Sequence, residues 1–433
     1  MKTLILKAKN KKQKYFSNFR NQGNILLSSS SSSFDEEDNT YNFENKIFNN
    51  RYIFIKYLSK GSFSNVWLIY DILEYNFKSA KIYFNKDYFD EFNNEIKMFN
   101  IINNKNNNIV NFTDIIQEDN VKIIIMELLG ISLLDIINDI SEKKIDMNIN
   151  LIKEIFKQIL NGYDGLHSNK IIHADIKPDN ILFNIYPNNL KQIITFIDDL
   201  DIKSIYNQFV DDLIPKDFDD FHKNKKKNVK KKVKIKSIKA IKDYLSKHIE
   251  SLTYEDDSNY DLDKLYSNNF KVKIIDFSNS EIENNIIKED DVYVRYYRPI
   301  ENILNLTFNL KSDIWAIGCV FYEIISGNYL FDINQKSNKN SHHLYQIFKT
   351  FEYQKYDKII EKCNYYDNFF VNNKLKIEHN YEVLTLKEKL LQYSLLDINL
   401  LDILNFITLF FIYDPNLRPD TKILLLHDFL HNY

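Results

Sequence analysis

The stretch HADIKPDNIL, residues 173–182, places two aspartates, a lysine and an asparagine among apolar neighbours. Ile171 and Ile172 precede it, and Phe183 follows it. Charged groups are costly beside a hydrophobic core unless they are paired or take part in chemistry. A polar turn without a function is the alternative, and it explains this concentration of charge poorly. The stretch therefore predicts a functional loop between a helix and a short apolar strand.

The composition is that of an ordinary globular protein of 433 residues, 44% of them hydrophobic and 27% charged. The formal net charge of −3 gives no global case for binding nucleic acid or membranes. Two cysteines cannot form a disulfide framework, and no run approaches the roughly 18 uncharged apolar residues of a membrane span. We therefore expect an intracellular protein in a reducing compartment, cytoplasmic or nuclear, without a membrane partner.

The first part of the chain predicts a disordered extension followed by a small β-rich lobe. Residues 1–48 are polar, with a six-serine run before an acidic segment, and we expect them to be disordered. From residue 52 the pattern changes to short apolar runs typical of strands, with one helical periodicity among them. The predicted strands are 52–58, 66–71, 78–84, 109–116 and 121–126, and the predicted helix is 87–101. Together they predict an antiparallel lobe at residues 52–128.

Residues 129–433 predict a larger, mainly helical lobe. Apolar residues between 152 and 166 form a helical stripe that leads into the opening stretch. Residues 186–270 interrupt this lobe as an insert and carry a basic block, Lys223–Lys236. We interpret the block as solvated and disordered, because charge runs are usually exposed. The predicted fold class is α+β, with two lobes and one insert in a single domain at residues 52–433.

The chemistry of the opening stretch resembles that of a protein-kinase catalytic loop. In that family's H-R-D-x-x-x-x-N consensus the aspartate accepts the substrate hydroxyl proton, and the asparagine holds a magnesium ion. The match here is His173-Ala174-Asp175 and then Asn180, with Lys177 two residues after the aspartate. The resemblance implies that Asp175 and Lys177 are catalytic residues and that Asn180 is a metal ligand.

A nucleotide site is predicted from motifs earlier in the chain. The segment LSKGSFSNVWL, residues 58–68, lies where a kinase glycine-rich loop would cover the ATP phosphates. Lys81 lies on the third predicted strand, as the V-A-I-K motif requires, and Glu95 lies on the next helix. Taken singly, these residues are equally typical of a turn, a surface lysine and a surface glutamate. The predicted nucleotide-binding residues are Leu58, Gly61, Ser64, Val66, Lys81, Glu95, Glu127 and Leu129.

The second half of the chain supplies the remaining kinase motifs. The segment IIDFSNS corresponds to D-F-G, so Asp276 is predicted to be the second magnesium ligand, although an acidic turn is the alternative. The segment RYYRPIE corresponds to A-P-E, and Arg418 is the expected partner of its Glu301. Asp313 lies where it would brace the backbone of the catalytic loop. The complete set implies that ATP and Mg²⁺ are the cofactors.

Residues 34–186 and 270–433 are similar to the SR protein kinases, within the same branch as the cyclin-dependent and mitogen-activated kinases. GSFSNVWLIYD resembles that family's G-H-F-S-T-V-W-L-x-x-D, and HADIKPDNIL resembles its H-T-D-I-K-P-E-N-I-L. The resemblance implies a bilobal, monomeric kinase that transfers the γ-phosphate of ATP to Ser or Thr of protein substrates, Arg/Ser-rich proteins among them. We do not expect direct nucleic-acid binding, because one basic run without interleaved aromatic residues is a weak footprint.

Four departures from the kinase pattern leave an alternative open. Ser59 and Ser64 replace loop glycines, Ser278 replaces the glycine of D-F-G, and Val294 stands where related kinases place a threonine. Each could slow turnover, but none removes a predicted metal ligand or the proton acceptor. The alternative is a pseudokinase that binds ATP or acts as a scaffold.

Substrate handling is predicted to differ from that of the SR protein kinases. That family uses an acidic groove on the large lobe to hold Arg-rich segments. Asn328, His342 and Lys349 stand where the family tends to carry Asp, Asp and Glu. Loss of acidic groups weakens the charge complementarity that attracts and aligns a cationic peptide. We therefore expect weaker and less processive phosphorylation of long Arg-Ser repeats.

Overall fold

The computed structural model describes residues 43–61, 63–102, 106–118, 120–145, 147–250, 257–283, 292–333, 338–352, 354–376, 381–393 and 400–431. The chain divides into one unit at Met1–Phe43 and another at Glu44–Tyr433, and the features below belong to the second. The predicted disorder of residues 1–48 falls mostly outside the described residues. Its last two residues are not disordered, because Ile47 and Phe48 form a strand that pairs with the next one.

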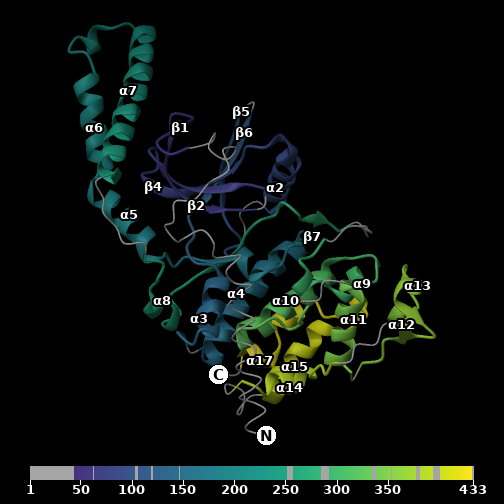
Figure 1. Ribbon diagram of the computed structural model, residues 1–433. Coiled ribbons are helices and arrows are strands. Elements are labelled where there is room, and N and C mark those ends of the chain that lie inside the picture. The colour runs from purple at the N-terminus through teal and green to yellow at the C-terminus, as the bar shows by residue number, and fades with distance from the viewer. Residues whose placement is uncertain are drawn as a thin grey trace, which may run out of the picture. The chain divides into compact units, whose positions relative to one another are not determined.

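An antiparallel sheet forms the first lobe, and the order of its described strands is β1-β2-β3-β4-β6-β5 (Figure 1). The strands are β1 Ile47–Phe48, β2 Tyr52–Lys60, β3 Asn65–Asp71, β4 Asn76–Tyr83, β5 Phe112–Glu118 and β6 Val121–Glu127. The predicted strands are confirmed to within a few residues. The predicted strand 109–116 begins late, because Ile109 instead forms a parallel bridge with Ile274 of the second lobe.

Helix α2, Phe89–Ile102, accompanies this sheet and confirms the predicted helix. Its apolar residues recur at three- and four-residue spacing, so they share one face. Phe92 packs against Tyr83 of β4, and Phe99 stacks on Phe112 of β5. Glu95 lies on the same buried side and is 0% exposed. A buried carboxylate needs partners, and its position points toward the junction of the two lobes.

Helix α10, Leu310–Ser326, lies at the centre of the second lobe, and nearly all of its side chains are buried. Asn309 caps its first turn, and Gly327 ends it with a φ of 65°, a conformation that favours glycine. The other helices of this lobe are α3 Leu133–Ser141, α4 Ile149–Ser168, α9 Ile300–Ile303, α11 Lys339–Thr350, α12 Asp357–Ile360, α13 Tyr366–Phe369, α14 Leu386–Leu390, α15 Leu400–Ile407, α16 Thr421–Leu425 and α17 Asp428–His431. None of the helices in the described residues combines the length and apolar character needed to cross a membrane.

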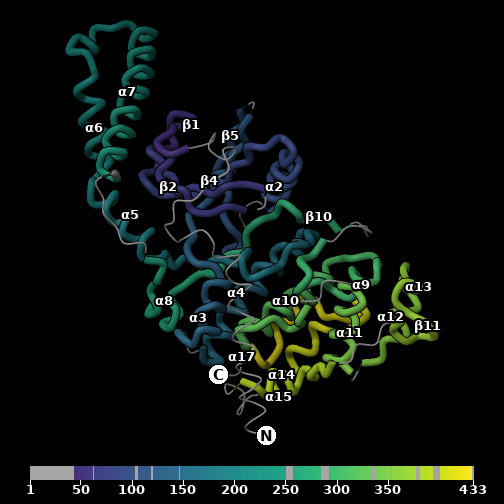
Figure 2. The backbone as a smooth tube through the Cα atoms, in the orientation of Figure 1, coloured from purple at the N-terminus to yellow at the C-terminus, as the bar shows by residue number. Residues whose placement is uncertain are grey.

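Two short strand pairs hold the loops at the junction of the lobes. Strand β7, Ile171–Ile172, pairs with β10, Glu281–Ile282, which is labelled in the tube of Figure 2. Strand β8, Ile181–Phe183, pairs with β9, Val272–Ile274. The opening stretch of the sequence joins β7 to β8, so it lies between these two pairs.

The insert is helical, and the prediction that its basic block is disordered is wrong. Its described helices are α5 Asn188–Asp199, α6 Ile202–Leu213, α7 Lys223–Glu250 and α8 Leu262–Tyr266, with α6 and α7 side by side in Figures 1 and 2. The physical reason is that α7 continues beyond the block and buries an apolar stripe, whose members are Val233 within the block and Ile238, Ile241 and Leu245 after it. Burial of one helix face stabilises a helix that its own charges disfavour.

The insert also has its own core, which we call the insert core. It joins α5, α6 and α7 to strands β2 and β3 of the sheet. Its buried members are Ile53, Ile55, Leu68, Tyr70, Ile72, Leu128, Leu190, Ile193, Ile197, Ile202, Ile238, Ile241 and Leu245. Leu265 and Phe270, also within residues 186–270, belong instead to the main core. The C-terminal end of the predicted insert therefore packs with the main core, whereas α5, α6 and α7 pack against the sheet.

Candidate active site

Lys81 of β4 links the two lobes through two carboxylates. Its Nζ lies 2.8 Å from Oε2 of Glu95 on α2 and 2.9 Å from Oδ1 of Asp276, which follows β9. Burial alone would lower the pKa of Lys81, but the negative charges of Asp276 and Glu95 raise it well above its usual value. Lys81 therefore stays protonated and remains available for a negatively charged ligand.

Tyr83 adds a second donor to the same glutamate. Its hydroxyl donates to Oε2 of Glu95 at 2.5 Å, and its side chain is fully buried. Burial and the nearby negative charge of Glu95 raise the pKa of the Tyr83 hydroxyl, so it stays a donor. Residues two apart on a strand share one face, and this spacing from Lys81 was the sequence signal that could have identified Tyr83.

Asp276 is held in one orientation by two side chains and one backbone N–H group, that of Ser278. Besides Lys81, the hydroxyl of Ser278 donates to its Oδ1 at 2.7 Å. Burial alone would raise the pKa of the Asp276 carboxyl, but Lys81 and Ser278 hold it well below its usual range. Asp276 has a φ of 67°, an uncommon conformation outside glycine that often marks functional sites. Ser278 thus replaces a glycine with a group that contacts the predicted metal ligand.

The segment after Asp276 is also tied to α2. Phe277 packs edge-on against Phe99 of α2 and against the ring of His173. The Nδ2 of Asn94 donates to the carbonyl oxygens of Ser278 at 2.9 Å and Ser280 at 2.8 Å. These contacts fix α2 and the Asp276 segment as one body. No local sequence pattern identifies Asn94, because its partners are main-chain atoms far along the chain.

The opening stretch forms a compact, hydrogen-bonded loop. Lys177 Nζ lies 2.9 Å from Oδ2 of Asp175. The Nδ2 of Asn180 donates to the carbonyl oxygen of Asp175 at 2.8 Å and to its Oδ2 at 3.1 Å. Ala174 has a φ of 65°, and this left-handed turn brings Asp175 back toward Asn180. The structure therefore brings Asp175, Lys177 and Asn180 into mutual contact.

Asp313 of α10 braces this loop, as predicted. Its carboxylate accepts hydrogen bonds from the backbone N–H groups of His173 at 2.8 Å and Ala174 at 3.2 Å. Its oxygens also lie 3.0 Å from Nε2 of His167 and 2.9 Å from the hydroxyl of Tyr293. The side chain is 0% exposed. A backbone that is bonded in this way to the central helix is held rigidly.

The predicted partner of Glu301 is also confirmed. Arg418 binds Glu301 through two parallel bonds of 2.7 Å, and both side chains are fully buried. Bidentate arginine–carboxylate pairs are directional as well as strong. The pair ties α9 to the segment before α16, so it supports the second lobe from a position outside the site.

Four other residues predicted to bind the nucleotide lie on β2, on β3 or in the turn between them. Val66 lies directly opposite Lys81 in the β3–β4 pair. Gly61 N donates to the carbonyl oxygen of Ser64 at 2.7 Å, which closes a tight turn between β2 and β3, and Ser64 is buried. Leu58 packs against the insert core. Their contacts with a nucleotide remain predictions.

The connection between the lobes runs from Glu127 to Gly130. The side chain of Glu127 accepts from the backbone N–H of Asn111 at 2.6 Å and from Nζ of Lys273 at 2.7 Å. Leu129 is buried in the main core. A Cβ on Gly130 would lie 1.8 Å from the carbonyl oxygen of Ile185, so only glycine fits there. The connection is thus held against both lobes.

Asn180 and Asp276, the two predicted metal ligands, lie on neighbouring segments. The backbone N–H of Ile275 donates to the carbonyl oxygen of Asn180 at 3.0 Å. Because the Nδ2 of Asn180 is used within the loop, its Oδ1 is the atom left for a cation. Two side-chain oxygens suit Mg²⁺, which usually combines one or two protein ligands with waters and phosphate oxygens. Within the described residues, no cluster of three or more His, Cys, Asp or Glu could hold a metal ion by itself.

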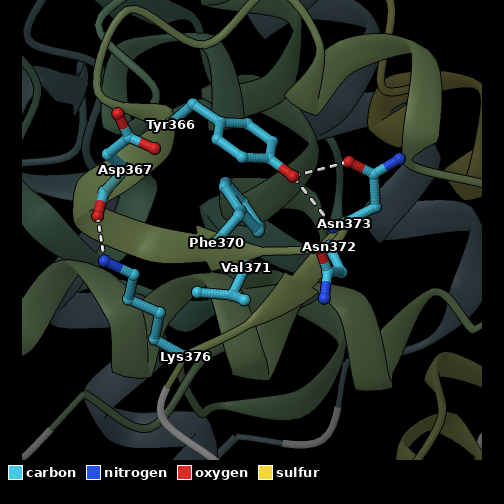
Figure 3. Close-up of a pocket in the computed structure, with 7 residues that line it drawn as sticks. All are labelled: Tyr366, Asp367, Phe370, Val371, Asn372, Asn373 and Lys376. Atoms are coloured by element: carbon cyan, nitrogen blue, oxygen red, sulfur yellow. Dashed lines mark hydrogen bonds between the residues drawn. The ribbon is translucent and has the colours of Figure 1, made fainter.

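A surface pocket lies elsewhere in the second lobe, at the hairpin of β11 Phe370–Val371 and β12 Lys374–Leu375 (Figure 3). Its polar groups bind one another, since the Tyr366 hydroxyl contacts both the side chain and the backbone N–H of Asn373. None of the predicted site residues lines it. It does not contribute to the candidate active site.

Comparisons with known proteins agree with this geometry. Residues 52–198 and 258–430 match the family model of the protein kinase domain. A putative serine/threonine-protein kinase of Acanthamoeba polyphaga mimivirus is 25% identical over 392 residues, which cover 69% of this chain and 71% of that protein. The serine/threonine-protein kinase SRPK of Physarum polycephalum is 29% identical over 225 residues, or 51% of this chain and 45% of that protein.

A human relative and a solved structure extend the comparison. SRSF protein kinase 3 of Homo sapiens is 34% identical over 148 residues, which cover 31% of this chain and 26% of that protein. The match to the human protein, like that to the Physarum one, thus spans less than half of the relative's length. A crystal structure of a kinase domain superposes with a TM-score of 0.62 at 20% identity, over 92% of this chain and all of the other. The bilobal kinase fold is therefore confirmed, and the chain belongs to the protein kinase domain family.

Proposed function

We propose that this chain is an active serine/threonine protein kinase that transfers the γ-phosphate of ATP to protein hydroxyl groups. The observation that carries the proposal is the position of Lys81 between Glu95 and Asp276. This arrangement joins both lobes at one cation and presents its charge where phosphates would bind. A chain that had lost catalysis would have no need to keep a buried lysine paired with two carboxylates from different elements.

The proposed mechanism assigns one task to each polar group. Asp175 accepts a hydrogen bond from the substrate hydroxyl and then its proton, and Lys177, 2.9 Å from Asp175, offsets negative charge on the transferring group. Lys81 orients the phosphates of the nucleotide. Asn180 and Asp276 hold Mg²⁺, which supplies charge neutralisation at the phosphate oxygens when it is bound. Positioning and electrostatics therefore provide most of the rate enhancement.

Two of the four departures that raised the pseudokinase alternative have a structural account. Ser278 bonds to Asp276 at 2.7 Å and so supports its orientation. Ser64 is buried and accepts the Gly61 N–H through its carbonyl oxygen, as a turn residue would. These contacts favour an active enzyme over a scaffold.

We also propose an SR-protein-kinase-like substrate preference with weak docking of Arg-Ser repeats. The names of two relatives, SRPK and SRSF protein kinase 3, support the preference. Of the positions aligned with the acidic groove, His342 is buried and its ring packs 5.3 Å from that of Tyr381. The Nδ2 of Asn328 bonds to Tyr393, and Lys349 is exposed and basic. None of the three supplies a negative charge to a cationic peptide.

The decisive experiment incubates the purified chain with Mg²⁺ and ATP and a panel of peptides. The panel holds Arg-Ser repeats, single Arg-directed serines, acidic-site serines and matched tyrosine peptides. We expect phosphate on serine or threonine, best with Arg-containing peptides. A start-trap experiment on a long Arg-Ser repeat then counts the phosphates added per binding event. No transfer to any peptide would support the pseudokinase, and many phosphates per event would contradict the weak-docking proposal alone.

A further inference from the structure

The insert carries a charge pattern that the catalytic function does not use. Between Lys223 and Lys239 the chain has ten lysines and no acidic residue. The whole chain has a formal net charge of −3, so without these ten lysines it would carry −13. An acidic protein has therefore concentrated positive charge in one segment. We call these lysines the basic surface of α7.

The basic surface is fixed in space rather than loose. The residues belong to one continuous helix, and Lys223 and Lys239 are about 24 Å apart along its axis. Ile238 and Ile241 are buried in the insert core, and Val233 is buried as well. With one face anchored, most of the lysines between 223 and 239 are exposed to solvent.

The lysines are not neutralised by the protein itself. In the part of the chain that the structure describes, none of the lysines from 223 to 239 has an acidic partner within ion-pair distance, and the α7 ion pair lies further on, at Lys242 and Asp243. Lysines four residues apart on a helix repel each other. Lys225 instead lies 3.3 Å from the ring centre of Phe221, and Lys226 and Lys230 face Phe218. These ring contacts steady the start of the helix and leave its charge in place.

Three classes of anionic partner can be compared on this surface. A membrane-binding helix needs an exposed apolar face, and the apolar face of α7 is already buried in the insert core. A protein partner is usually held by exposed aromatic or arginine anchors. Among the described residues between Lys223 and Lys239, the large hydrophobic side chain that is exposed is Ile235, at 42%, which is neither aromatic nor arginine. A phosphodiester backbone needs only a row of positive charges.

We propose that the basic surface of α7 binds the phosphate backbone of nucleic acid without reading its sequence. This revises the expectation drawn from the sequence alone, which was that one basic run is too weak a footprint for direct nucleic-acid binding. Lysine recognises phosphate as a point charge, and the nearby rings of Phe218 and Phe221 are in contact with Lys225, Lys226 and Lys230. The surface therefore supplies affinity and not base specificity. The proposal is independent of phosphoryl transfer, because the lysines lie outside the candidate active site.

The test measures fluorescence anisotropy of labelled single-stranded RNA, double-stranded RNA and double-stranded DNA against the full chain. We expect a dissociation constant in the micromolar range near 0.1 M salt, with a steep decrease in affinity as salt rises. Four exposed lysines on one stripe, Lys223, Lys227, Lys231 and Lys234, are replaced by Gln, which preserves helix propensity. This variant should bind at least about tenfold more weakly, and its salt dependence should be shallower by about 2 to 4 in logarithmic slope.

Two matched variants separate this surface from net charge. Replacing Lys355, Lys358, Lys387 and Lys422, exposed lysines of the second lobe, by Gln removes the same charge and should leave binding within about twofold. Replacing the four α7 lysines by Arg should retain binding. Equal weakening by the two Gln variants, or no binding by the unmodified chain at low salt, would overturn the proposal. Poly-glutamate or anionic vesicles that bind more tightly than any nucleic acid would also overturn it and assign another partner.

Discussion

The catalytic junction and the α5–α7 insert use charge in opposite ways. At the junction Lys81, Glu95 and Asp276 are largely buried and paired within 3 Å. In the insert the lysines of the basic surface are mostly exposed, and the buried groups are apolar. Buried pairs lose much when one partner is removed, whereas exposed charges lose little. The first region can therefore be recognised from its sequence motifs, whereas the second is recognised only from the burial of its apolar side chains.

The largest effect is expected at the proton acceptor. Asp175→Asn keeps the shape of the loop but removes the basic oxygen, so kcat should decrease at least about 100-fold. The binding of Mg²⁺ and ATP, measured by thermal shift, should persist because Lys81 and Asp276 are unchanged. Near-normal turnover in this variant would show that the catalytic loop has been assigned wrongly.

The second largest effect is expected at Lys81. It tests whether the role of Lys81 in catalysis depends on its burial or on its position between the two carboxylates. Lys81→Met leaves two carboxylates without their cation, and kcat/KM should decrease about 100-fold through misplaced phosphates. Lys78→Met is the matched control, since Lys78 is buried on the same strand and paired with Asp71 at 3.0 Å and Glu74 at 2.7 Å. Both variants should lose stability, by about 3 kcal/mol.

Only Lys81→Met should lose catalysis when it and Lys78→Met are both assayed well below their melting temperatures. Equal loss of activity in the two would mean that the junction acts through stability. The difference between the junction and the α5–α7 insert would then be one of burial and not of chemistry.

A smaller effect is expected where α2 meets the segment after Asp276. Asn94→Ala removes two hydrogen bonds to main-chain carbonyls, each worth about 1 kcal/mol. The Asp276 segment should then sample other positions, and kcat should decrease about tenfold. Asn93→Ala on the exposed side of the same helix is the control. An unchanged rate for Asn94→Ala would show that Lys81 and Tyr83 hold α2 without it.

The smallest effect on catalysis is expected in the insert. Ile241→Asp places a charge in the insert core, where the side chain is 0% exposed. Opening of α7 should become at least about tenfold more frequent, as measured by trypsin cleavage at its lysines. Ile235→Asp on the exposed side should change cleavage little. Peptide phosphorylation should change far less than in the junction variants, and a large loss would show that the insert supports the sheet in its catalytic form.

Much of the fold was predictable because its patterns are local. Short apolar runs identified β2, β3, β4 and β6, and three- and four-residue spacing identified α2. The residues predicted from motif spacing, Lys81, Asp175 and Asp276 among them, lie at one junction. Motifs with short, fixed spacing can be recognised even in a chain of unusual composition, since each needs a particular side chain at a particular turn or strand position.

The rest depended on contacts that no local pattern contains. Asn94 binds carbonyls that lie 184 and 186 residues further along the chain. The helical state of the basic block depends on an apolar stripe that meets β2 and β3 from far away in the sequence. His342 was aligned with a groove, yet the fold buries it beside Tyr381. In each case tertiary packing decided what local propensity could not.

We expect that no residue of similar shape can replace Asp313. Its two oxygens serve donors from four places in the chain, at His167, His173, Ala174 and Tyr293. An asparagine would turn one acceptor into a donor facing other donors, and a glutamate would not fit a side chain that is 0% exposed. In a library of all substitutions this site should therefore be as intolerant as Asp175, the proposed proton acceptor.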